Sequence, residues 1–449
     1  MSNTIKLRKG YDIKLTGTAT KFELPSFSSR VFAVKPPDFK GLIPRLMVEQ
    51  GSEVKAGSPI FHDKADDKVI FTSPVSGEIV EIVRGERRVI LEIHILADAK
   101  NEFVDFGKAN PSTLSAEEIK SKLLQSGCWT LIRQRPFNKV PQTELTPKNI
   151  FISGFDSSPY ATDLEFAVAG EEQQLQTAID ALSKITEGKI YVGLSVAQKG
   201  HSIFEKLHNV VITYFDGPHP AGNVGIQIHH TAPINKDETV WTVNAQDLVT
   251  IGRLFNNGVY DTSRFFSISG NLVNKRGYFK SNIGCQVSKV LENNIQNKAV
   301  RIISGNPLTG DKIDINGFIS TFHTSISVIE EGTEPEFFGW LFPSYKRPSL
   351  SKTFTSYMNP QTEYNVNTNM HGEERAFVVS GEYEKVLPMD ILPLQLMKAC
   401  YTFDINNMEG LGIYEIVEED IALCEFVCTS KMPLQQILRE AITYLESES

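Results

Sequence analysis

The sequence predicts an α+β protein with several domains, and three observations lead to that class. Residues 1–110 contain short alternating apolar strands separated by Gly and Pro. From Asn149 onward, strand, helix and strand alternate, as they do around a parallel sheet. Beyond Pro388 the apolar residues return at helical spacing. The length of 449 residues agrees with about three domains at roughly 150 residues each.

The first two segments are expected to be a barrel and a connector. Apolar runs at residues 31–34, 42–48 and 69–82 alternate with turns, so residues 1–110 are expected to form a small β-barrel or sandwich. Residues 111–148 are expected to hold a helix from Leu114 to Gln125, followed by a Pro-rich connector.

Residues 149–258 are expected to form a Rossmann-like α/β domain. Strands are predicted at residues 149–154, 189–194 and 210–215, and an amphipathic helix at residues 172–185. A dinucleotide site needs Gly-x-Gly-x-x-Gly between strand and helix, so that backbone N–H groups reach the pyrophosphate. The chain has neither this fingerprint nor a Walker A loop. The pattern therefore predicts the sheet without indicating NAD binding.

The last two segments are expected to differ in secondary structure, because their apolar residues are spaced differently. Residues 259–335 return to short strands, for example at residues 265–270 and 300–305. Residues 336–449 are expected to be mainly helical, with an acidic interruption at residues 415–420 and an amphipathic helix at residues 433–446.

Composition excludes several classes of protein. Lys and Arg number 45 against 54 Asp and Glu, a net charge of −9, and nucleic-acid binders need a basic face. No apolar run is long enough to span a bilayer, and the N-terminus has no secretory h-region. Five Cys are too few for a disulfide framework. We expect a cytoplasmic protein without a transmembrane segment.

The most unusual stretch is the loop after the predicted strand 210–215. It contains two Gly and two Pro around His219, and α/β folds place ligands after such strands. His229 and His230 follow, without the spacing or extra ligands that a metal site needs. The alternative is a structural turn, and the residues leave both open. The ligand or interface candidates are Asp216, Gly217, Pro218, His219, Pro220, Ala221, Gly222, His229 and His230.

Three cysteines gather near the end of the chain. Cys424 and Cys428 are four residues apart, and Cys400 precedes them. A four-iron cluster requires four thiolates, so we interpret these as buried or free thiols. Neither a metal site nor a catalytic residue is predicted, because no nucleophile–base pattern can be assigned from order or spacing.

The segment from Gly51 to Ile82 resembles the biotinyl/lipoyl carrier barrel. It shares Gly51-x-x-Val54-x-x-Gly57-x-Pro59 and, after a hairpin, Ser73-Pro74-Val75-Ser76-Gly77. In carriers a Lys at the hairpin tip is modified. Lys64 and Lys68 lie in the hairpin, but neither falls at the acceptor spacing, which favours an unmodified barrel.

Nearly the whole chain resembles the A-type subunit of the Na+-translocating NADH:quinone reductase (NQR complex). The resemblance is carried by a series of rare strings in order. They lie at residues 9–12, 71–77, 126–130, 135–141, 216–222, 301–305, 338–340, 383–390 and 419–428.

The resemblance implies a peripheral subunit on the cytoplasmic face of the inner membrane. The complex oxidises NADH, reduces quinone (ubiquinone) and exports Na+ (EC 7.2.1.1). Flavins and iron–sulfur centres belong to other subunits, so this subunit is expected to hold no cofactor and the isolated chain not to be catalytic. Its expected role is structural or quinone-proximal, with docking on the large membrane subunit. The implied fold adds a β-grasp-like domain at residues 259–335.

Two other functions remain as alternatives. One is a stand-alone carrier protein modified at Lys64 or Lys68 of the barrel. The other is a soluble NAD-dependent dehydrogenase that uses the α/β domain, against which the missing Gly fingerprint argues.

Overall fold

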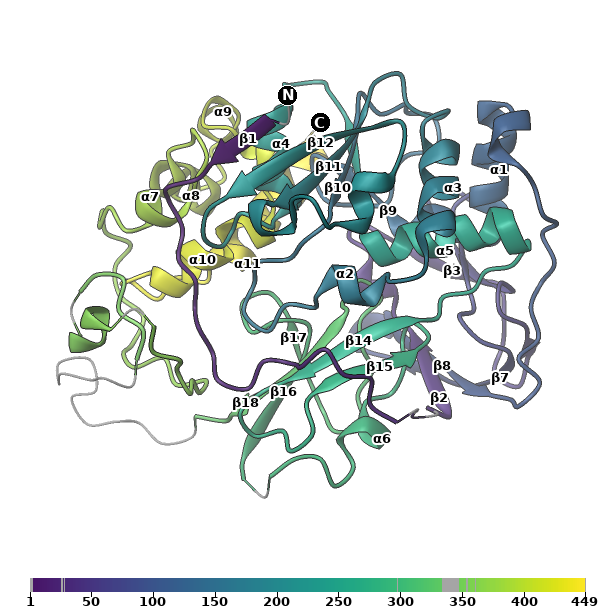
Figure 1. Ribbon diagram of the computed structural model, residues 1–449, viewed down its shortest axis with the longest axis horizontal. Coiled ribbons are helices and arrows are strands. Elements are labelled where there is room, and N and C mark those ends of the chain that lie inside the picture. Colours follow the sequence, from purple (N-terminus) through teal and green to yellow (C-terminus); the bar gives the residue numbers. More distant parts are fainter. Residues whose placement is uncertain are drawn as a thin grey trace.

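A computed structural model describes residues 3–25, 27, 29–296, 298–332, 347–352, 354–359 and 361–448. Within these ranges the strands form four sheets, of six, five, four and three strands (Figure 1). The expected string at residues 338–340 and the expected boundary at 335/336 lie outside the described residues.

The N-terminal barrel consists of two small antiparallel sheets packed on each other. Their inward side chains, such as Phe61, Ile79 and Ile93, are fully buried and share one apolar core. One sheet is β2 (Val31–Val34), β8 (Ile90–Ala97), β7 (Gly77–Arg84) and β4 (Glu53–Val54), in that order. The other is β3 (Pro44–Leu46), β5 (Pro59–Asp63) and β6 (Ile70–Thr72).

The six-stranded sheet is parallel except for its last strand, β9. Its order is β1 (Asn3–Lys6), β12 (Val210–Asp216), β11 (Ile190–Ser195), β10 (Ile150–Ser153), β13 (Val240–Val243) and β9 (Ile132–Arg135). Both edge strands come from outside the expected range 149–258. β1 pairs with β12 although it lies in the expected barrel range, and β9 pairs with β13 although it lies in the expected connector. Each edge strand satisfies backbone groups that β12 and β13 would otherwise expose.

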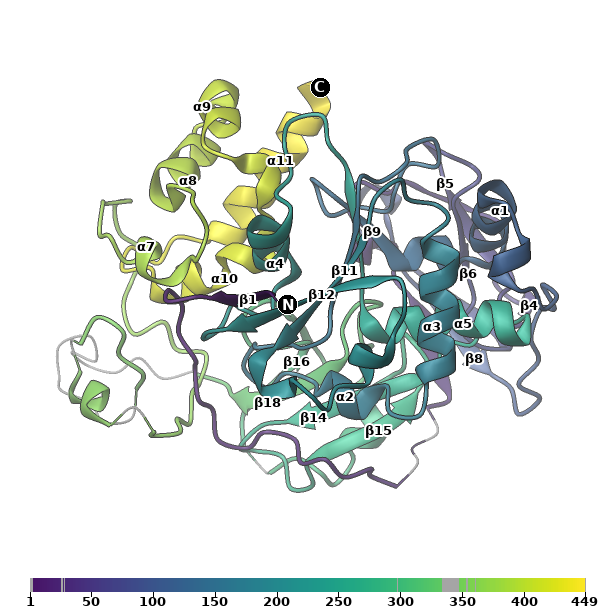
Figure 2. The same ribbon diagram turned by 45° about the horizontal axis from the view of Figure 1, so that its top comes forward.

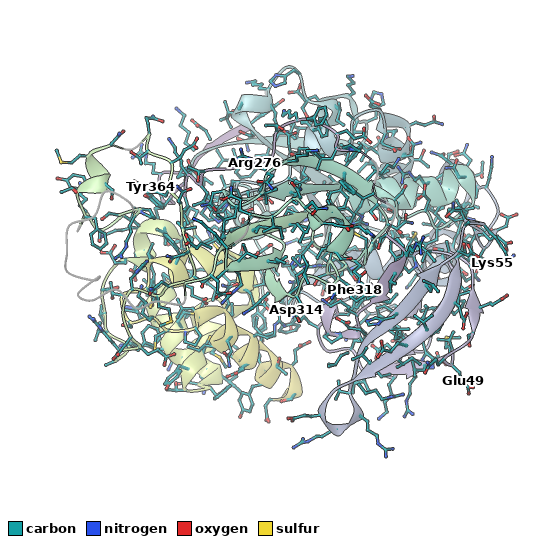
Figure 3. The ribbon with its side chains drawn as sticks, turned by 90° about the horizontal axis from the view of Figure 1, so that it is seen from below. Glu49, Lys55, Arg276, Asp314, Phe318 and Tyr364 are labelled. Atoms are coloured by element: carbon teal, nitrogen blue, oxygen red, sulfur yellow. The ribbon has the colours of Figure 1, made fainter. Side chains whose placement is uncertain are left out.

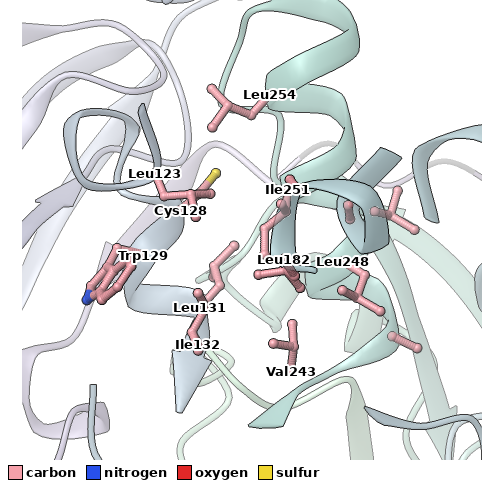
Figure 4. Packing of buried hydrophobic residues seen from close by; sticks show 14 of the residues in the cluster. Leu123, Cys128, Trp129, Leu131, Ile132, Leu182, Val243, Leu248, Ile251 and Leu254 are labelled. Carbon is pink, nitrogen blue, oxygen red and sulfur yellow. The ribbon is translucent and has the colours of Figure 1, made fainter. Parts of the chain in front are cut away.

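Helices cover the six-stranded sheet. They are α3 (Glu172–Leu182), α4 (Val224–Thr231) and α5 (Ala245–Asn257). Two further helices pack next to other sheets: α1 (Ala116–Ser126) contacts β6 of the barrel, and α2 (Leu164–Ala167) contacts β14 of the five-stranded sheet. Figure 4 shows where α1, β9, α3 and α5 meet, with Leu123, Trp129, Leu182 and Ile251 in one cluster. The same core includes the inward side chains of the barrel. The barrel and the six-stranded sheet therefore share one continuous apolar core.

The five-stranded sheet has a parallel central pair. Its order is β15 (Gly277–Ser281), β14 (Arg264–Ser269), β18 (Ser325–Glu330), β16 (Val300–Ser304) and β17 (Asp311–Ile313), and α6 (Ser288–Leu291) packs against it. β14 and β18 run parallel, and the other pairs are antiparallel. The chain between β1 and β2 runs along this sheet (Figure 1), bridging Leu15 to Tyr364 and Glu23 to Tyr278.

The chain is mainly helical from Tyr383 onward. The helices of this part are α7 (Tyr383–Val386), α8 (Pro393–Tyr401), α9 (Ile405–Gly410), α10 (Glu418–Val427) and α11 (Leu434–Glu448). The expectation of an acidic interruption at residues 415–420 was wrong in part. Glu418, Glu419 and Asp420 form the first turn of α10, because carboxylates stabilise a helix N-terminus and Asp420 accepts the Val417 N–H at 3.0 Å.

The barrel and the helical part flank the five-stranded sheet. From below, the barrel with Glu49 and Lys55 lies on one side, and the helical part lies on the other (Figure 3). Phe318, beside the five-stranded sheet, contacts His94 of the barrel with ring centroids 4.7 Å apart. No helix in the described ranges combines the length and the apolar character that crossing a bilayer requires.

Candidate functional site

The six-stranded sheet changes its direction of growth between β10 and β13. The chain adds β11 and β12 on one side of β10 and then places β13 on the other side. The connections that leave the carboxyl ends of β10 and β13 therefore diverge. Open α/β sheets bind their ligands in the crevice that such a divergence creates.

A cavity of about 200 Å³ occupies this crevice. It is bounded by the ends of β10 and β13, by β9, by the loop before α4, by α10 and by loops of the five-stranded sheet. Its lining residues are Leu131, Arg133, Arg135, Asn138, Ser153, Phe155, Asp156, Ser158, Leu164, His219, Gly222, Asn223, Val224, Thr242, Val243, Asn244, Asp247, Asn306, Leu308, Thr309, Phe322, Thr324 and Glu419. Both larger sheets and the helical part thus contribute to one cavity.

Arg133 places a cation and an aromatic face side by side on the wall. Its guanidinium carbon lies 3.6 Å from the centroid of the Phe322 ring, a close cation–π contact. The Arg133 Nη1 donates to Oδ1 of Asn138 at 3.3 Å. No carboxylate of the described residues pairs with Arg133, so its remaining N–H groups can serve a ligand.

Arg135 joins the sheet to the helical part. It is 1% exposed, and its two Nη atoms donate to Asp420 at 2.8 Å and to Glu419 at 2.5 Å. Its Nε has no partner among the described residues. Burial raises the pKa of the Asp420 carboxyl, although Arg135 opposes the shift. Because a Cβ on Gly225 would lie 2.4 Å from Asp420 oxygens, α4 and α10 approach closely only with glycine there.

A second buried ion pair forms part of the cavity wall through Asp247. Arg264 Nη2 donates to Oδ1 of Asp247 at 2.6 Å, and both side chains are almost fully buried. Burial raises the pKa of Asp247, and the Arg264 charge acts against it. Asn244 precedes this first turn of α5 and caps it by accepting the Gln246 N–H at 3.0 Å. The pair ties α5 to β14 and thereby fixes one wall of the cavity.

His219 lines the cavity and is held by two contacts. Its backbone N–H donates to Oδ1 of Asp12 at 2.8 Å, and its Nδ1 lies 3.0 Å from Oγ of Ser157. The same Oγ accepts the Gly222 N–H at 2.8 Å, so the Ser157 hydroxyl can donate to Nδ1. Burial lowers the pKa of His219 to about 4, so the ring is neutral at neutral pH.

The Ser157–His219 contact lacks the geometry of a hydrolytic triad. In such a triad the serine contacts Nε2 and a carboxylate orients Nδ1. Here Ser157 contacts Nδ1, and Asp12 binds the backbone amide instead of the ring. The contact therefore holds the loop and supplies no activated nucleophile.

The other residues of the candidate loop hold its backbone. Leu7 donates its N–H to the Asp216 carbonyl at 2.8 Å, and a Cβ on Gly217 would come within 2.6 Å of the Leu7 carbonyl oxygen. Ala221 is fully buried. The two prolines flank His219. Of the predicted candidates, only His219 and Gly222 line the cavity.

His229 and His230 lie on α4, away from the cavity lining. His229 Nδ1 lies 2.7 Å from Oε2 of Glu415, and its Nε2 accepts the Asp390 N–H at 3.0 Å. His230 Nε2 lies 2.6 Å from the Pro388 carbonyl oxygen, and burial lowers its pKa. Both side chains connect α4 to the helical part. In the described part of the chain, no group of three or more His, Cys, Asp or Glu side chains could hold a metal ion.

The three C-terminal cysteines are buried in the apolar core of the helical part. Cys428 Sγ accepts the Tyr383 hydroxyl at 2.8 Å. Burial raises the pKa of Cys400 to about 12 and also raises the pKa of Cys424. These two thiols are therefore protonated at neutral pH, whereas Cys428 serves as a hydrogen-bond acceptor inside the core.

Sequence reasoning missed most of the cavity wall. Arg133, Asp247 and Phe322 come from distant segments, and nothing local marks them as neighbours. One signal did exist for Arg135 and Glu419. They begin two of the strings on which the resemblance rests, residues 135–141 and 419–428, and the structure joins these strings by an ion pair.

The arrangement defines a class: a multidomain α+β protein with a polar cavity at the switch point of a parallel sheet, beside a small two-sheet barrel. Three family descriptions match the chain in order. They are the NqrA N-terminal barrel-sandwich hybrid domain at residues 5–98, the NqrA second alpha/beta domain at 114–260, and the NQRA C-terminal domain at 266–314. The chain belongs to the NqrA family of the Na(+)-translocating NADH-quinone reductase.

Curated relatives match over their full length. The chain is 35% identical to the A-type subunit of the Na(+)-translocating NADH-quinone reductase of Yersinia pestis bv. Antiqua (strain Angola), over 99% of this chain and 100% of the relative. It is 35% identical to the corresponding protein of Neisseria meningitidis serogroup B and 33% to that of Vibrio atlanticus, with the same coverage. The family resemblance is confirmed, and the N-terminal domain is a barrel-sandwich hybrid.

A solved structure is similar at a coarser level. An NAD+-reducing [NiFe]-hydrogenase in the H2-reduced state aligns with a TM-score of 0.39 and 12% identity, over 76% of this chain and 63% of that chain. Its air-oxidised form gives a TM-score of 0.36. Likeness of this degree carries no argument about function.

Proposed function

We propose that this chain is a peripheral subunit, of the NqrA type, in a membrane complex that couples NADH oxidation and quinone reduction to Na+ export. The observation that carries the proposal is the full-length identity of 35% to a curated NqrA protein. The complex corresponds to EC 7.2.1.1, and the chain contributes to it as one of its subunits. Its place is the cytoplasmic face of the inner membrane, where it contacts the other subunits, above all the large membrane subunit.

Within the complex, the switch-point cavity is the candidate for a quinone-proximal ligand site. Arg133, Asn138 and Asn244 offer N–H groups to a carbonyl-bearing ring, and Phe155 and Phe322 offer apolar faces. His219 is neutral and adds a polar group without a charge. The loop Asp216–Gly222 is then the ligand or interface loop, and His229 and His230 hold α4 against the helical part.

The chain itself is proposed to work without a cofactor. The sequence contains no Gly-rich phosphate-binding loop of the Rossmann or Walker A type. The three C-terminal thiols are buried among apolar side chains. A visible spectrum of the purified chain tests this directly. A flavin or iron–sulfur absorption band in the purified chain would contradict it.

The finer fold assignment is also a proposal. The strand order around β10 supports a Rossmann-like unit, and the parallel pair β14–β18 supports a β-grasp-like unit. We keep the divisions 1–110, 111–148, 149–258, 259–335 and 336–449, except that β1 and β9 are counted with the six-stranded sheet.

One contact argues against the carrier alternative. Lys64 and Lys68 lie at the exposed turn between β5 and β6, where a carrier would need a freely swinging tip. In this turn Asp66 Oδ2 accepts the Thr143 hydroxyl at 2.5 Å, which ties the tip to the connector. Intact-mass measurement decides the point, because a lipoyl or biotinyl adduct would be visible.

Co-expression with the remaining subunits tests the proposed function. An affinity tag on this chain is expected to recover a complex with Na+-dependent NADH:quinone reductase activity. His219→Ala is expected to lower quinone reduction or recovery of the complex. Glu187→Lys, an exposed residue far from the cavity, serves as the control. Unchanged activity and unchanged recovery of His219→Ala would return the loop to a purely structural role.

A further inference from the structure

The net negative charge of the chain is concentrated in its helical part. Residues 383–448 contain twelve Asp or Glu and four Lys or Arg, a net charge of −8 against −9 for the whole chain. Some of these carboxylates form ion pairs with residues of other parts of the chain: Glu446 pairs with Lys139, and Glu409 pairs with Lys236. The described residues provide no cation for Asp404, Glu440 or Glu448.

Three exposed aromatic side chains lie where α8, α9 and α11 meet. Phe403 is 43% exposed and Tyr444 is 38% exposed, and their ring centroids are 5.2 Å apart in an edge-to-face contact. Tyr401, two residues before Phe403, is 58% exposed. Figure 2 shows α8, α9 and α11 together at the corner of the molecule away from the barrel strands. Clustered, exposed aromatic rings are typical of the centres of protein interfaces.

The backbone at Phe403 is unfavourable for an aromatic residue. Its φ is 54°, in the left-handed region that glycine or asparagine normally occupies at the end of a helix. Two hydrogen bonds close this turn, from Phe403 N–H to the Cys400 carbonyl at 3.1 Å and from Asp404 N–H to the Ala399 carbonyl at 3.0 Å. Because glycine would make the same turn without strain, the turn does not explain the ring. Local rules are broken in this way mainly at functional sites.

Carboxylates surround these rings. Glu440 and Glu448 precede and follow Tyr444 by four residues, so they lie on the same side of α11, and both are exposed. Asp404 caps α9 directly beside Phe403. Aromatic faces and carboxylates both attract guanidinium and ammonium groups. The nearby Lys398 of α8 contacts another ring: its Nζ lies 5.8 Å from the centroid of Phe377.

We propose that this aromatic–acidic patch (Tyr401, Phe403, Asp404, Glu440, Tyr444 and Glu448) docks a Lys- and Arg-rich cytoplasmic segment of a membrane-spanning partner subunit. The proposal rests on the proposed function. Charge complementarity selects the occupant, because the cytoplasmic loops of membrane proteins carry an excess of Lys and Arg. Anionic lipid would be repelled by the same carboxylates.

Binding of the full-length chain to membranes that contain the remaining subunits tests the patch. Glu440→Lys with Glu448→Lys is expected to weaken binding about tenfold and to reduce its salt dependence. The matched control is Glu117→Lys with Glu187→Lys, two exposed carboxylates on the far side of the sheet, which is expected to bind within about twofold of the unmodified chain.

Phe403→Gly separates docking from folding. It relieves the left-handed backbone, so we expect the melting temperature of the isolated chain to be maintained while binding to the membranes weakens. Undiminished binding of both Phe403→Gly and the double Lys variant would overturn the patch. Strong binding to phosphatidylglycerol vesicles that contain no protein would overturn it as well. If the unmodified chain does not bind the subunit-containing membranes, the result contradicts the proposed function itself and not only the patch.

Discussion

At the residue scale, the cavity combines neutral and charged groups that a distant part of the chain holds in place. His219 is neutral because it is buried, and its loop is fixed by Asp12 and Ser157. Arg135 stays charged because the buried Asp420 and the partly exposed Glu419, both on α10, accept its hydrogen bonds. The proposed ligand site therefore depends on the position of α10.

The lowered pKa of His219 predicts a pH dependence of stability. In the unfolded chain a histidine takes up a proton near pH 6.5, whereas His219 in the folded chain does so only near pH 4. Stability is therefore lost as the pH falls below about 6.5. Between pH 7 and pH 5 the unmodified chain is expected to lose about 2 kcal/mol more unfolding free energy than His219→Gln. Urea unfolding at both pH values measures the difference, and identical losses in the two chains would refute the assignment.

The sequence identified the candidate loop but only part of the site. The two Gly and two Pro around His219 are a local signal, and the strand before them predicted where the loop lies. Arg135 and Asp420 are 285 positions apart, so no local pattern could pair them. Phe322 is an ordinary apolar residue until Arg133 stacks on it.

At the element scale, two helices approach each other more closely than side chains normally allow. Gly252 of α5 faces α3, where an added Cβ would lie 2.0 Å from the Gln174 carbonyl oxygen. The α5 backbone thus packs directly on the α3 backbone. This contact helps to hold α5 in place, and the first turn of α5 lines the cavity.

Gly252→Ala is therefore expected to destabilise the chain. In an exposed helix the same change would stabilise by up to about 1 kcal/mol, but here the helices must separate, at a cost of about 1–3 kcal/mol. Gly410→Ala is the matched control, because its Cβ would meet nothing within 4 Å. Differential scanning fluorimetry should show a lower melting temperature for Gly252→Ala only. Equal melting temperatures would mean that α3 and α5 are not in this contact.

Element types were predicted better than element membership. The strand at residues 31–34 was located from its apolar run, and the helix near residues 433–446 from its helical period. The placement of β1 and β9 in the six-stranded sheet was not, since the pairing partner of an edge strand leaves no mark in its own few residues. Similarly, the acidic residues 418–420 were interpreted as a break between helices. They begin α10, but no Ser or Thr precedes them to mark a helix N-terminus in the sequence.

At the scale of the whole molecule, the chain separates its proposed tasks among its parts. The barrel and the sheets form continuous apolar cores, and the cavity lies where the sheets meet the helical part. The helical part carries a net charge of −8 and the exposed aromatic patch. A partner bound to this patch would also contact the body that supplies Glu419 to the cavity, which connects docking to the proposed ligand site.

The most direct test of the central claim is NADH-driven Na+ uptake into inverted membrane vesicles. Vesicles are prepared from cells that produce the remaining subunits with or without this chain. We predict Na+ uptake only when the chain is present, and restored uptake when purified chain is added to the deficient vesicles. Equal Na+ uptake in vesicles that lack the chain would contradict its role in the pump.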